Sequence, residues 1–191
     1  MFYNTLMKTL INKNDIVKAA LLVIEKEGFH TFTIKKVADY MGTDMQGILT
    51  QFTDANSLID AAMKQSLIEG LEKNLEECIF KDNDSLSFLT QLFNLTLSGA
   101  LQNPKIVKFH FYYSFIQESV KCESAKDILI FIEKVWSVFE PTINNSQKEQ
   151  VKRRLYQAFS SILFIGIFPT IFCTISINRW ADDLAHSVIG K

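Results

Sequence analysis

The side chains that could carry out acid–base, nucleophilic or metal chemistry are few and scattered. The three histidines and three cysteines are His30, His110, His186, Cys78, Cys122 and Cys173. They form no C-x-x-C pair and no Cys/His ligand spacing, and the chain has no G-x-S-x-G, H-E-x-x-H, G-x-G-x-x-G or P-loop motif. The sequence therefore predicts a protein that is not an enzyme, with no catalytic residue, no metal site and no cofactor. The odd number of dispersed cysteines is typical of a reduced, cytoplasmic protein.

Polar side chains that can form paired hydrogen bonds lie in the range Gly42 to Phe52. The amides of Gln46 and Gln51 can pair with the edge of adenine, and Thr50 can hydrogen-bond or contact a thymine methyl group. The same range has no lysine or arginine and a single acid, Asp44. Because phosphate neutralisation supplies most non-specific affinity for DNA, this range is suited to a weak or strongly base-dependent interaction.

Three short helical patterns hold these side chains. The first runs from Asn12 to Glu27, the second from Thr33 to Gly42, and the third begins with Thr43 or Asp44 as its N-cap. A fourth, longer pattern runs from Asp54 to about Phe80. Two short helices joined by a tight turn match the helix-turn-helix, although three small amphipathic helices are also typical of an ordinary helical bundle.

The composition favours a mostly helical chain. Of its 191 residues 48% are hydrophobic, and it has only 7 glycines and 3 prolines, which favours long helices over turn-rich all-β folds. Beyond the fourth pattern, apolar stretches and short polar breaks indicate five further helices, about nine in total. We therefore predict an all-α fold. The charges of the 20 basic and 21 acidic residues nearly cancel. The net charge therefore gives no indication of binding to nucleic acid or to a membrane.

One long uncharged segment raises the question of a membrane. From Leu155 to Asn178 there is no charged residue, and the apolar run from Ile162 to Ile177 within it approaches the length of a transmembrane helix. Gly166, Pro169 and several polar residues interrupt the segment, so we expect no membrane span. The alternative is a helix buried on most sides, as at a dimer interface.

A series of sequence landmarks lies between Asp15 and Met63. They are Ala19-Ala20, Glu27-Gly28-Phe29, Thr33, Val37-Ala38, Met41-Gly42, Phe52, Asp54 and Leu58. Together they resemble the amino-terminal region of the TetR family of bacterial transcriptional regulators, over about a quarter of the chain. The resemblance implies a three-helix helix-turn-helix domain over residues 1–56 that binds double-stranded DNA. It also implies a helical effector-binding and dimerisation domain over residues 57–191.

The resemblance further implies which residues meet DNA. Thr33 and Lys35 would touch phosphate or the groove edge, and the third helix would enter the major groove. The candidate DNA-binding residues are Thr33, Lys35, Lys36, Asp44, Met45, Gln46, Gly47, Leu49, Thr50 and Gln51. The sequence departs from the family pattern at three positions, where Leu49 replaces the usual tyrosine, Gln51 the usual histidine and Ala55 the usual phosphate-binding lysine.

Aromatic residues are concentrated in the second part of the chain, where twelve of the 16 phenylalanines follow Ala55. An aromatic-rich helical bundle can enclose an apolar cavity, although plain core packing explains any single residue equally well. By the resemblance, this region would bind a small hydrophobic effector and form a homodimer through its last two helices, Lys148 to Ile167 and Trp180 to Ile189. The candidate ligand-binding residues are Phe88, Leu92, Phe109, His110, Tyr113, Trp136, Phe159 and Leu163.

Two functions remain open. The first is a dimeric TetR-like regulator that binds a two-fold symmetric operator and responds to a small hydrophobic ligand. The alternative is a TetR-fold protein with weakened or lost DNA binding that acts through a ligand or a protein partner. The alternative draws on Leu49, on Ala55, and on the absence of any lysine or arginine in the predicted recognition helix.

Overall fold

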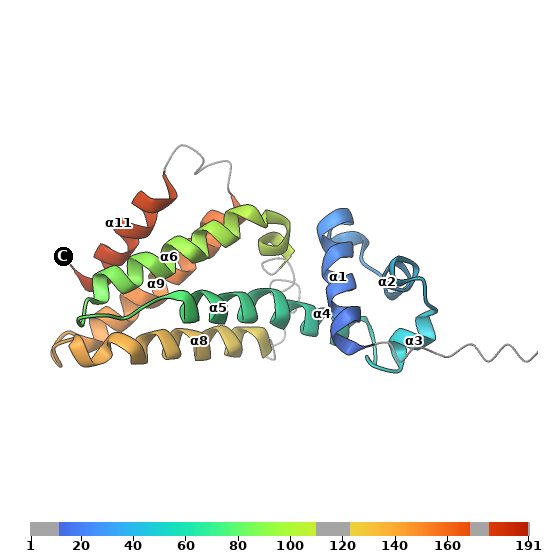
Figure 1. Ribbon diagram of the computed structural model, residues 1–191, viewed down its shortest axis with the longest axis horizontal. Coiled ribbons are helices and arrows are strands. Elements are labelled where there is room, and N and C mark those ends of the chain that lie inside the picture. Colours follow the sequence, from blue (N-terminus) through green and yellow to red (C-terminus); the bar gives the residue numbers. More distant parts are fainter. Residues whose placement is uncertain (1–11, 110–122, 169–175, 191) are drawn as a thin grey trace, which may run out of the picture. The chain divides into compact units, whose positions relative to one another are not determined.

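The computed structural model describes residues 12–109, 123–168 and 176–190. Within these ranges all the regular secondary structure is helical, with no strand (Figure 1). Nine α-helices are described from end to end, together with a π-helical segment and two short 3₁₀ turns (Phe29–Thr31 and Glu140–Thr142). The all-α class and the number of helices predicted from the sequence are confirmed. The chain divides into two compact units, one ending at Met63 and the other beginning at Lys64.

The first unit consists of four α-helices around one small core. They are α1 (Lys13–Glu27), α2 (Ile34–Met41), α3 (Met45–Leu49) and α4 (Ala55–Met63). Helix α1 packs against both α2 and α4, and α2 packs against α3. One fully buried residue from each helix lies in the shared core: Ile16, Val37, Ile48 and Leu58. Helix α4 therefore belongs with the first three helices, whereas the sequence placed the boundary after residue 56.

Helix ends in this unit follow the capping residues that the sequence predicts. Asn12 Oδ1 accepts a hydrogen bond from the backbone N–H of Asn14 at 3.0 Å before α1, and Thr33 Oγ1 accepts from the N–H of Lys36 at 3.3 Å before α2. Such side chains satisfy backbone N–H groups that have no partner inside the helix. Gly28, with a φ of 87°, ends α1. Local chemistry therefore sets these bounds.

The second unit contains the remaining helices. The π-helical segment (Lys64–Glu69) is followed by α5 (Gly70–Glu77), α6 (Ser85–Gln102), α8 (Glu123–Phe139), α9 (Lys148–Ile167) and α11 (Ile177–Ile189). Residues 104–109 are also helical. Helices α6, α9 and α11 pack against one another, and α8 packs against α5, α9 and the π-helical segment.

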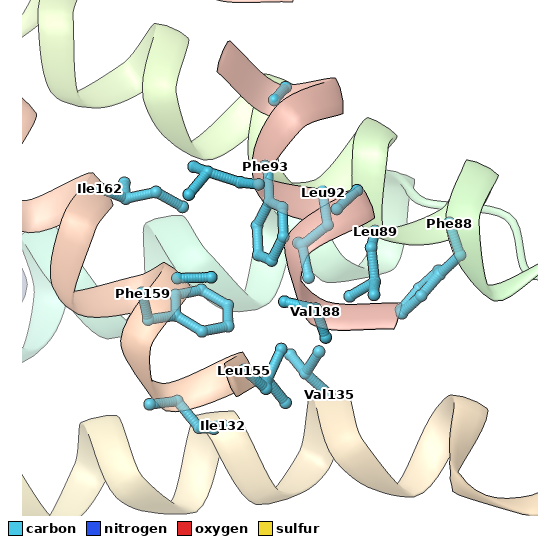
Figure 2. Close-up of a cluster of buried hydrophobic side chains, with 14 of the residues drawn as sticks. Phe88, Leu89, Leu92, Phe93, Ile132, Val135, Leu155, Phe159, Ile162 and Val188 are labelled. Carbon is cyan, nitrogen blue, oxygen red and sulfur yellow. The ribbon is translucent and has the colours of Figure 1, made fainter. Parts of the chain in front are cut away.

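The core of the second unit is built from side chains of its four long helices (Figure 2). Phe93 of α6 meets Phe159 of α9 edge-on with ring centroids 5.5 Å apart, and Phe131 of α8 meets Phe159 at 5.6 Å. Edge-on aromatic pairs are favourable beyond the area that they bury. Leu155 of α9 and Val188 of α11 have no exposed surface. Helices α6, α8, α9 and α11 therefore close around one core.

An exposed polar cluster links α8 to α9 outside that core. The carboxylate of Glu133 accepts hydrogen bonds from Lys152 Nζ at 2.8 Å and from the Tyr156 hydroxyl at 2.6 Å. The bonds from Lys152 and Tyr156 lower the pKa of Glu133, and the same bonds raise the pKa of each donor. Because solvent screens exposed charges, this cluster aligns the two helices more than it stabilises them.

The long helix predicted from Asp54 to about Phe80 is confirmed from Ala55 to Glu77, but it ends before Phe80 and contains a π-helical segment that the sequence did not predict. The backbone is α-helical over Ala55–Met63, π-helical over Lys64–Glu69 and α-helical over Gly70–Glu77. Acidic Glu77 occupies the last turn, where the helix dipole disfavours negative charge. Cys78 is extended (φ −80°, ψ 134°), and Phe80 packs edge-on against Phe88 of α6 at 5.6 Å. After Glu77 the chain is no longer helical, and Phe80 packs against α6.

Cys78 supplies a test of this helix end. Burial, and secondarily the charge of Glu77, raise the pKa of its thiol from 9.0 to about 11. Because the thiolate is the reactive form, we expect alkylation near pH 8 to be roughly 100-fold slower than for an ordinary thiol. Iodoacetamide labelling of a Cys122→Ser, Cys173→Ser variant, followed by mass spectrometry, measures the rate. The same variant in urea is the control, and equal rates in the folded and unfolded chains would contradict the prediction.

The uncharged segment is described up to Phe168. Leu155, Phe159 and Ile162 of α9 lie in the core of the second unit, whereas Phe164 is 52% exposed. The helix is thus buried along one face by its own unit, while residues 169–175 lie outside the described ranges. Among the helices in the described part of the chain, none combines the length and hydropathy that a membrane crossing requires.

Candidate nucleic-acid interface

A tight turn at Gly42 joins α2 to α3. Gly42 has the left-handed conformation (φ 65°, ψ 32°). Its N–H donates to the carbonyl of Asp39 at 3.2 Å, and the N–H of Thr43 donates to the carbonyl of Ala38 at 3.0 Å. These bonds satisfy carbonyl groups at the end of α2 and redirect the chain into α3. The arrangement of α2, turn and α3 is the helix-turn-helix geometry that the sequence predicts.

Replacing Gly42 by alanine tests this turn. No atom lies within 4 Å of a Cβ built at Gly42, so only the backbone conformation opposes the change. We expect Gly42→Ala to lower the free energy of unfolding by about 1–2 kcal/mol, measured by urea denaturation. Gly99 is the matched control, because it lies inside α6 with equally open space. Gly99→Ala should stabilise the chain by about 0.5–1 kcal/mol, and the same sign for both variants would refute this reasoning.

Local hydrogen bonds fix α3 and engage two of the candidate DNA-binding residues. Asp44 Oδ1 accepts from the N–H of Gly47 at 2.6 Å, so its carboxylate caps the helix. The Thr50 hydroxyl donates to the carbonyl of Gly47 at 2.7 Å. Asp44 therefore has a structural role, whereas Thr50 keeps its oxygen lone pairs and its methyl group for other contacts.

The candidate residues divide into an exposed set and an inner set. Ile48 is fully buried in the core of the first unit, and its sequence neighbours Gly47 and Leu49 are half-buried. Met45, at 44%, is among the most exposed large apolar side chains in the described ranges. The exposed candidates other than the capping Asp44 form what we call the α2–α3 surface: Thr33, Lys35, Met45, Gln46, Thr50 and Gln51. This surface offers amides, hydroxyls and one apolar group, which are the groups that read base edges.

Several lysines of the first unit are already engaged with protein groups. Lys36 Nζ lies 2.5 Å from a carboxylate oxygen of Glu27. Lys26 and Lys13 lie over the rings of Tyr40 and Phe52, with Nζ 4.8 Å and 5.1 Å from the ring centroids. Exposed ion pairs contribute little stability, so Lys36 can exchange Glu27 for another anion at small cost.

The start of α4 carries a negative charge where the resemblance leads one to expect a positive one. Asp54 Oδ1 accepts from the N–H of Ser57 at 2.8 Å, and Ser57 Oγ accepts from the N–H of Asp54 at 3.2 Å. Ala55, the first residue of α4, is half-buried. This reciprocal cap was not predicted, although the spacing of Asp54 and Ser57 is a readable variant of the capping box. The lysine contacts with Tyr40 and Phe52 were also missed and left no signal in the local sequence.

The candidate ligand-binding residues lie in the second unit, so far as the structure describes them. Phe88, Leu92 and Phe159 lie in one core (Figure 2), to which Trp136 also belongs. Phe109 is buried and Leu163 is half-buried. His110 and Tyr113 lie outside the described ranges. The rings form two groups, because Phe88 and Trp136 both meet Phe139 at 6.3 Å and 5.3 Å whereas Phe159 meets Phe93 and Phe131. Their role in ligand binding stays a prediction.

Comparisons with known proteins identify the fold. No family model and no curated protein matches the sequence. A transcriptional regulator from Rhodococcus sp. Rha1 superimposes with a TM-score of 0.75 at 12% identity, covering 94% of this chain and 97% of that one. Thermus thermophilus FadR, a TetR-family transcriptional repressor in complex with lauroyl-CoA, gives 0.68 at 14% identity, with 93% of both chains covered. FadR from Bacillus halodurans, a fatty acid degradation regulator, gives 0.64 at 13% identity, covering 93% of this chain and 94% of that one. The structures that superimpose over nearly the full length thus include TetR-family transcriptional regulators, and the chain has the TetR fold.

Proposed function

We propose that the chain is a DNA-binding transcriptional regulator of the TetR type, whose operator binding is modulated by a small hydrophobic ligand. The observation that carries this proposal is the α2–α3 surface, where Gln46 is exposed on α3 and Thr50 and Gln51 are exposed in the turn that follows it. The turn at Gly42 and the cap at Asp44 fix α3. The second helix of such a motif can enter the major groove of DNA. The protein acts on DNA in the cytoplasm and is not an enzyme.

The regulator is a homodimer formed through α9 and α11. Both helices pack against α6 by one face and leave another face exposed. The exposed face of α9 carries Arg153, and that of α11 carries charges of both signs, Arg179, Asp182 and Asp183. A two-fold axis brings the same surface of two copies together, so these charges can pair across it. Two recognition helices related by that axis bind a two-fold symmetric operator.

The effector is a small hydrophobic molecule bound in the second unit. Support comes from the aromatic side chains gathered there, including Phe88, Trp136 and Phe159. Further support comes from Thermus thermophilus FadR, which shares the fold and was solved with lauroyl-CoA. The ligand acts by changing the distance between the two recognition helices, which couples the ligand site to the DNA site.

The test is a selection of random duplex DNA on the purified protein at low salt, followed by fluorescence anisotropy on the enriched sequence. An enriched site with two-fold symmetry is the expected result. A scrambled duplex of equal length and composition is the control for non-specific binding. Recovery of no enriched sequence contradicts the proposal.

A second function has specific observations in its favour. From Gly42 to Phe52 the chain has no cation, the start of α4 carries Asp54, and Lys36 is paired with Glu27. These features favour a TetR-fold protein that acts through a ligand or a protein partner without an operator. The same selection distinguishes the two functions, because this alternative predicts no enriched DNA.

A further inference from the structure

Gln65 carries a buried polar atom that has no hydrogen-bond partner. Its side-chain oxygen, Oε1, is enclosed by protein and accepts no hydrogen bond in the part of the chain that the structure describes. A buried acceptor of this kind has lost its bonds to water and gained none in return, so it is uncommon in native proteins. Where it occurs, it marks strain, a function or a missing bound molecule.

The backbone around Gln65 is unusual in a second way. Gln65 lies in the π-helical segment Lys64–Glu69, which is the only π-helix in the described ranges. A π-helix accommodates more residues per turn than an α-helix, so it redirects the side chains of that turn. Such segments are rare and frequently lie at functional sites. Two independent rarities, one of backbone and one of side chain, thus coincide at Gln65.

Contacts within the second unit hold this segment in place. The π-helical segment packs against α8, and Lys64 Nζ lies 3.9 Å from a carboxylate oxygen of Asp127 on that helix. Ile68 is buried, and Leu67 packs against the core of the unit. Gln65 therefore lies on a segment that is anchored in the second unit through Lys64, Leu67 and Ile68. An acceptor on an anchored segment loses less freedom on ligand binding than one on a loose segment.

We propose that Gln65 Oε1 accepts a hydrogen bond from a ligand that has an apolar body and one O–H or N–H group. This inference rests on the proposed function, because it concerns the small hydrophobic effector, and it adds the class of polar group. An amide oxygen only accepts hydrogen bonds, so the ligand has to donate. Alcohols, phenols and amides qualify, whereas ethers, ketones and ionised carboxylates do not. The apolar body follows from the hydrophobic effector of the proposed function and from the apolar character of the same segment, in which Leu67 packs against the core of the unit and Ile68 is buried.

The test uses matched pairs of probes that differ in the donor. We choose decanol and decyl methyl ether, naphthol and methoxynaphthalene, and cyclododecanol and cyclododecanone, titrated into the full chain by calorimetry. At least one hydroxyl probe should bind roughly tenfold more tightly than its partner, which is the value of one hydrogen bond to an otherwise unpaired group. Binding of no hydroxyl probe, or equal binding within every pair, overturns the proposal.

Gln65→Met assigns the effect to this residue. Methionine has a similar volume and no strong acceptor, so the hydroxyl probe should lose its advantage while the affinity of its partner stays unchanged. The ligand-free variant should also have a higher Tm, because an unsatisfied buried acceptor is gone. A merely structural Gln65 predicts the higher Tm alone. Retention of the hydroxyl preference in Gln65→Met overturns the proposal.

Gln91→Met is the matched control in the same unit. Gln91 is exposed on α6, and its Nε2 donates to Ser87 Oγ at 3.2 Å. This variant should change neither the preference for hydroxyl probes nor the Tm. None of these measurements uses DNA, so failure of the operator selection and failure of the Gln65 assignment are separate results.

Discussion

The Lys35→Ala, Gln46→Ala double variant is expected to lose at least about 100-fold in affinity for the selected operator. Both side chains are exposed on the α2–α3 surface, and neither lies in the core of the first unit. A glutamine paired with a base edge contributes about 1–3 kcal/mol of discrimination, and a lysine on phosphate adds a term that does not depend on sequence. Fluorescence anisotropy measures the loss.

The two substitutions should have different effects on DNA binding when each is made alone. Gln46→Ala should relax the base preference at one position of each half-site, whereas Lys35→Ala should weaken all sequences alike. Lys18→Ala is the matched control, because Lys18 is equally exposed on α1 and outside the α2–α3 surface. Sedimentation should show the same oligomeric state for every variant. An undiminished operator affinity in the double variant, with its helical content intact, would count against DNA binding by this surface.

Leu155→Ala is expected to lower the free energy of unfolding by about 2–5 kcal/mol. Leu155 has no exposed surface and lies in the core of the second unit, among Val135, Phe159 and Val188 (Figure 2). Removing its isobutyl group leaves a cavity that rigid neighbours fill only in part. Urea denaturation followed by circular dichroism measures the change.

Leu129→Ala provides the contrast for that experiment. Leu129 is on α8 of the same unit, is 50% exposed, and is replaced by the same residue. Truncating this exposed side chain removes little buried surface, so the free energy of unfolding should change by no more than about 0.5 kcal/mol. Equal destabilisation by the two variants would mean that burial does not decide the stability of this unit.

Much of the first unit could be predicted from sequence because its helix ends depend on local chemistry. Thr33 and Asp44 bond backbone groups three residues ahead, and Gly42 adopts the left-handed turn that its position between two patterns indicates. Capping and turn chemistry act over a few residues and are therefore readable in one sequence. The spacing of Val37 and Ile48 likewise marks the faces that the structure buries.

Features that depend on packing between distant segments could not be predicted. The π-helical segment Lys64–Glu69 keeps apolar residues at nearly helical spacing, so its sequence looks like ordinary α-helix. The contact of Lys26 with Tyr40 joins α1 to α2 and depends on how those helices pack. Such partners are set by tertiary structure, which periodicity does not encode.

The ligand-binding residues could not be predicted with certainty from sequence either, because their positions also depend on tertiary packing. Phe88 and Phe159 were selected as aromatic residues on apolar helix faces, and both are buried among other core side chains. Helical spacing identifies the face that avoids water, but a cavity wall and a packed core need the same residues there. Gln65, by contrast, escaped notice because one polar residue at the edge of an apolar pattern has no special spacing.

The lysine contacts of the first unit also bear on how such a protein would find its site. A cation that meets phosphate releases condensed counterions, and this entropy makes ordinary DNA binding steeply dependent on salt. Lys36 would first have to break its ion pair with Glu27, and Lys26 its contact with the ring of Tyr40. The net favourable free energy of their contacts with phosphate is therefore smaller. Weak attachment to random sequence shortens each sliding episode along the double helix. The search would then proceed mainly through repeated encounters from solution, and residence would be long only at sequences that the glutamines recognise.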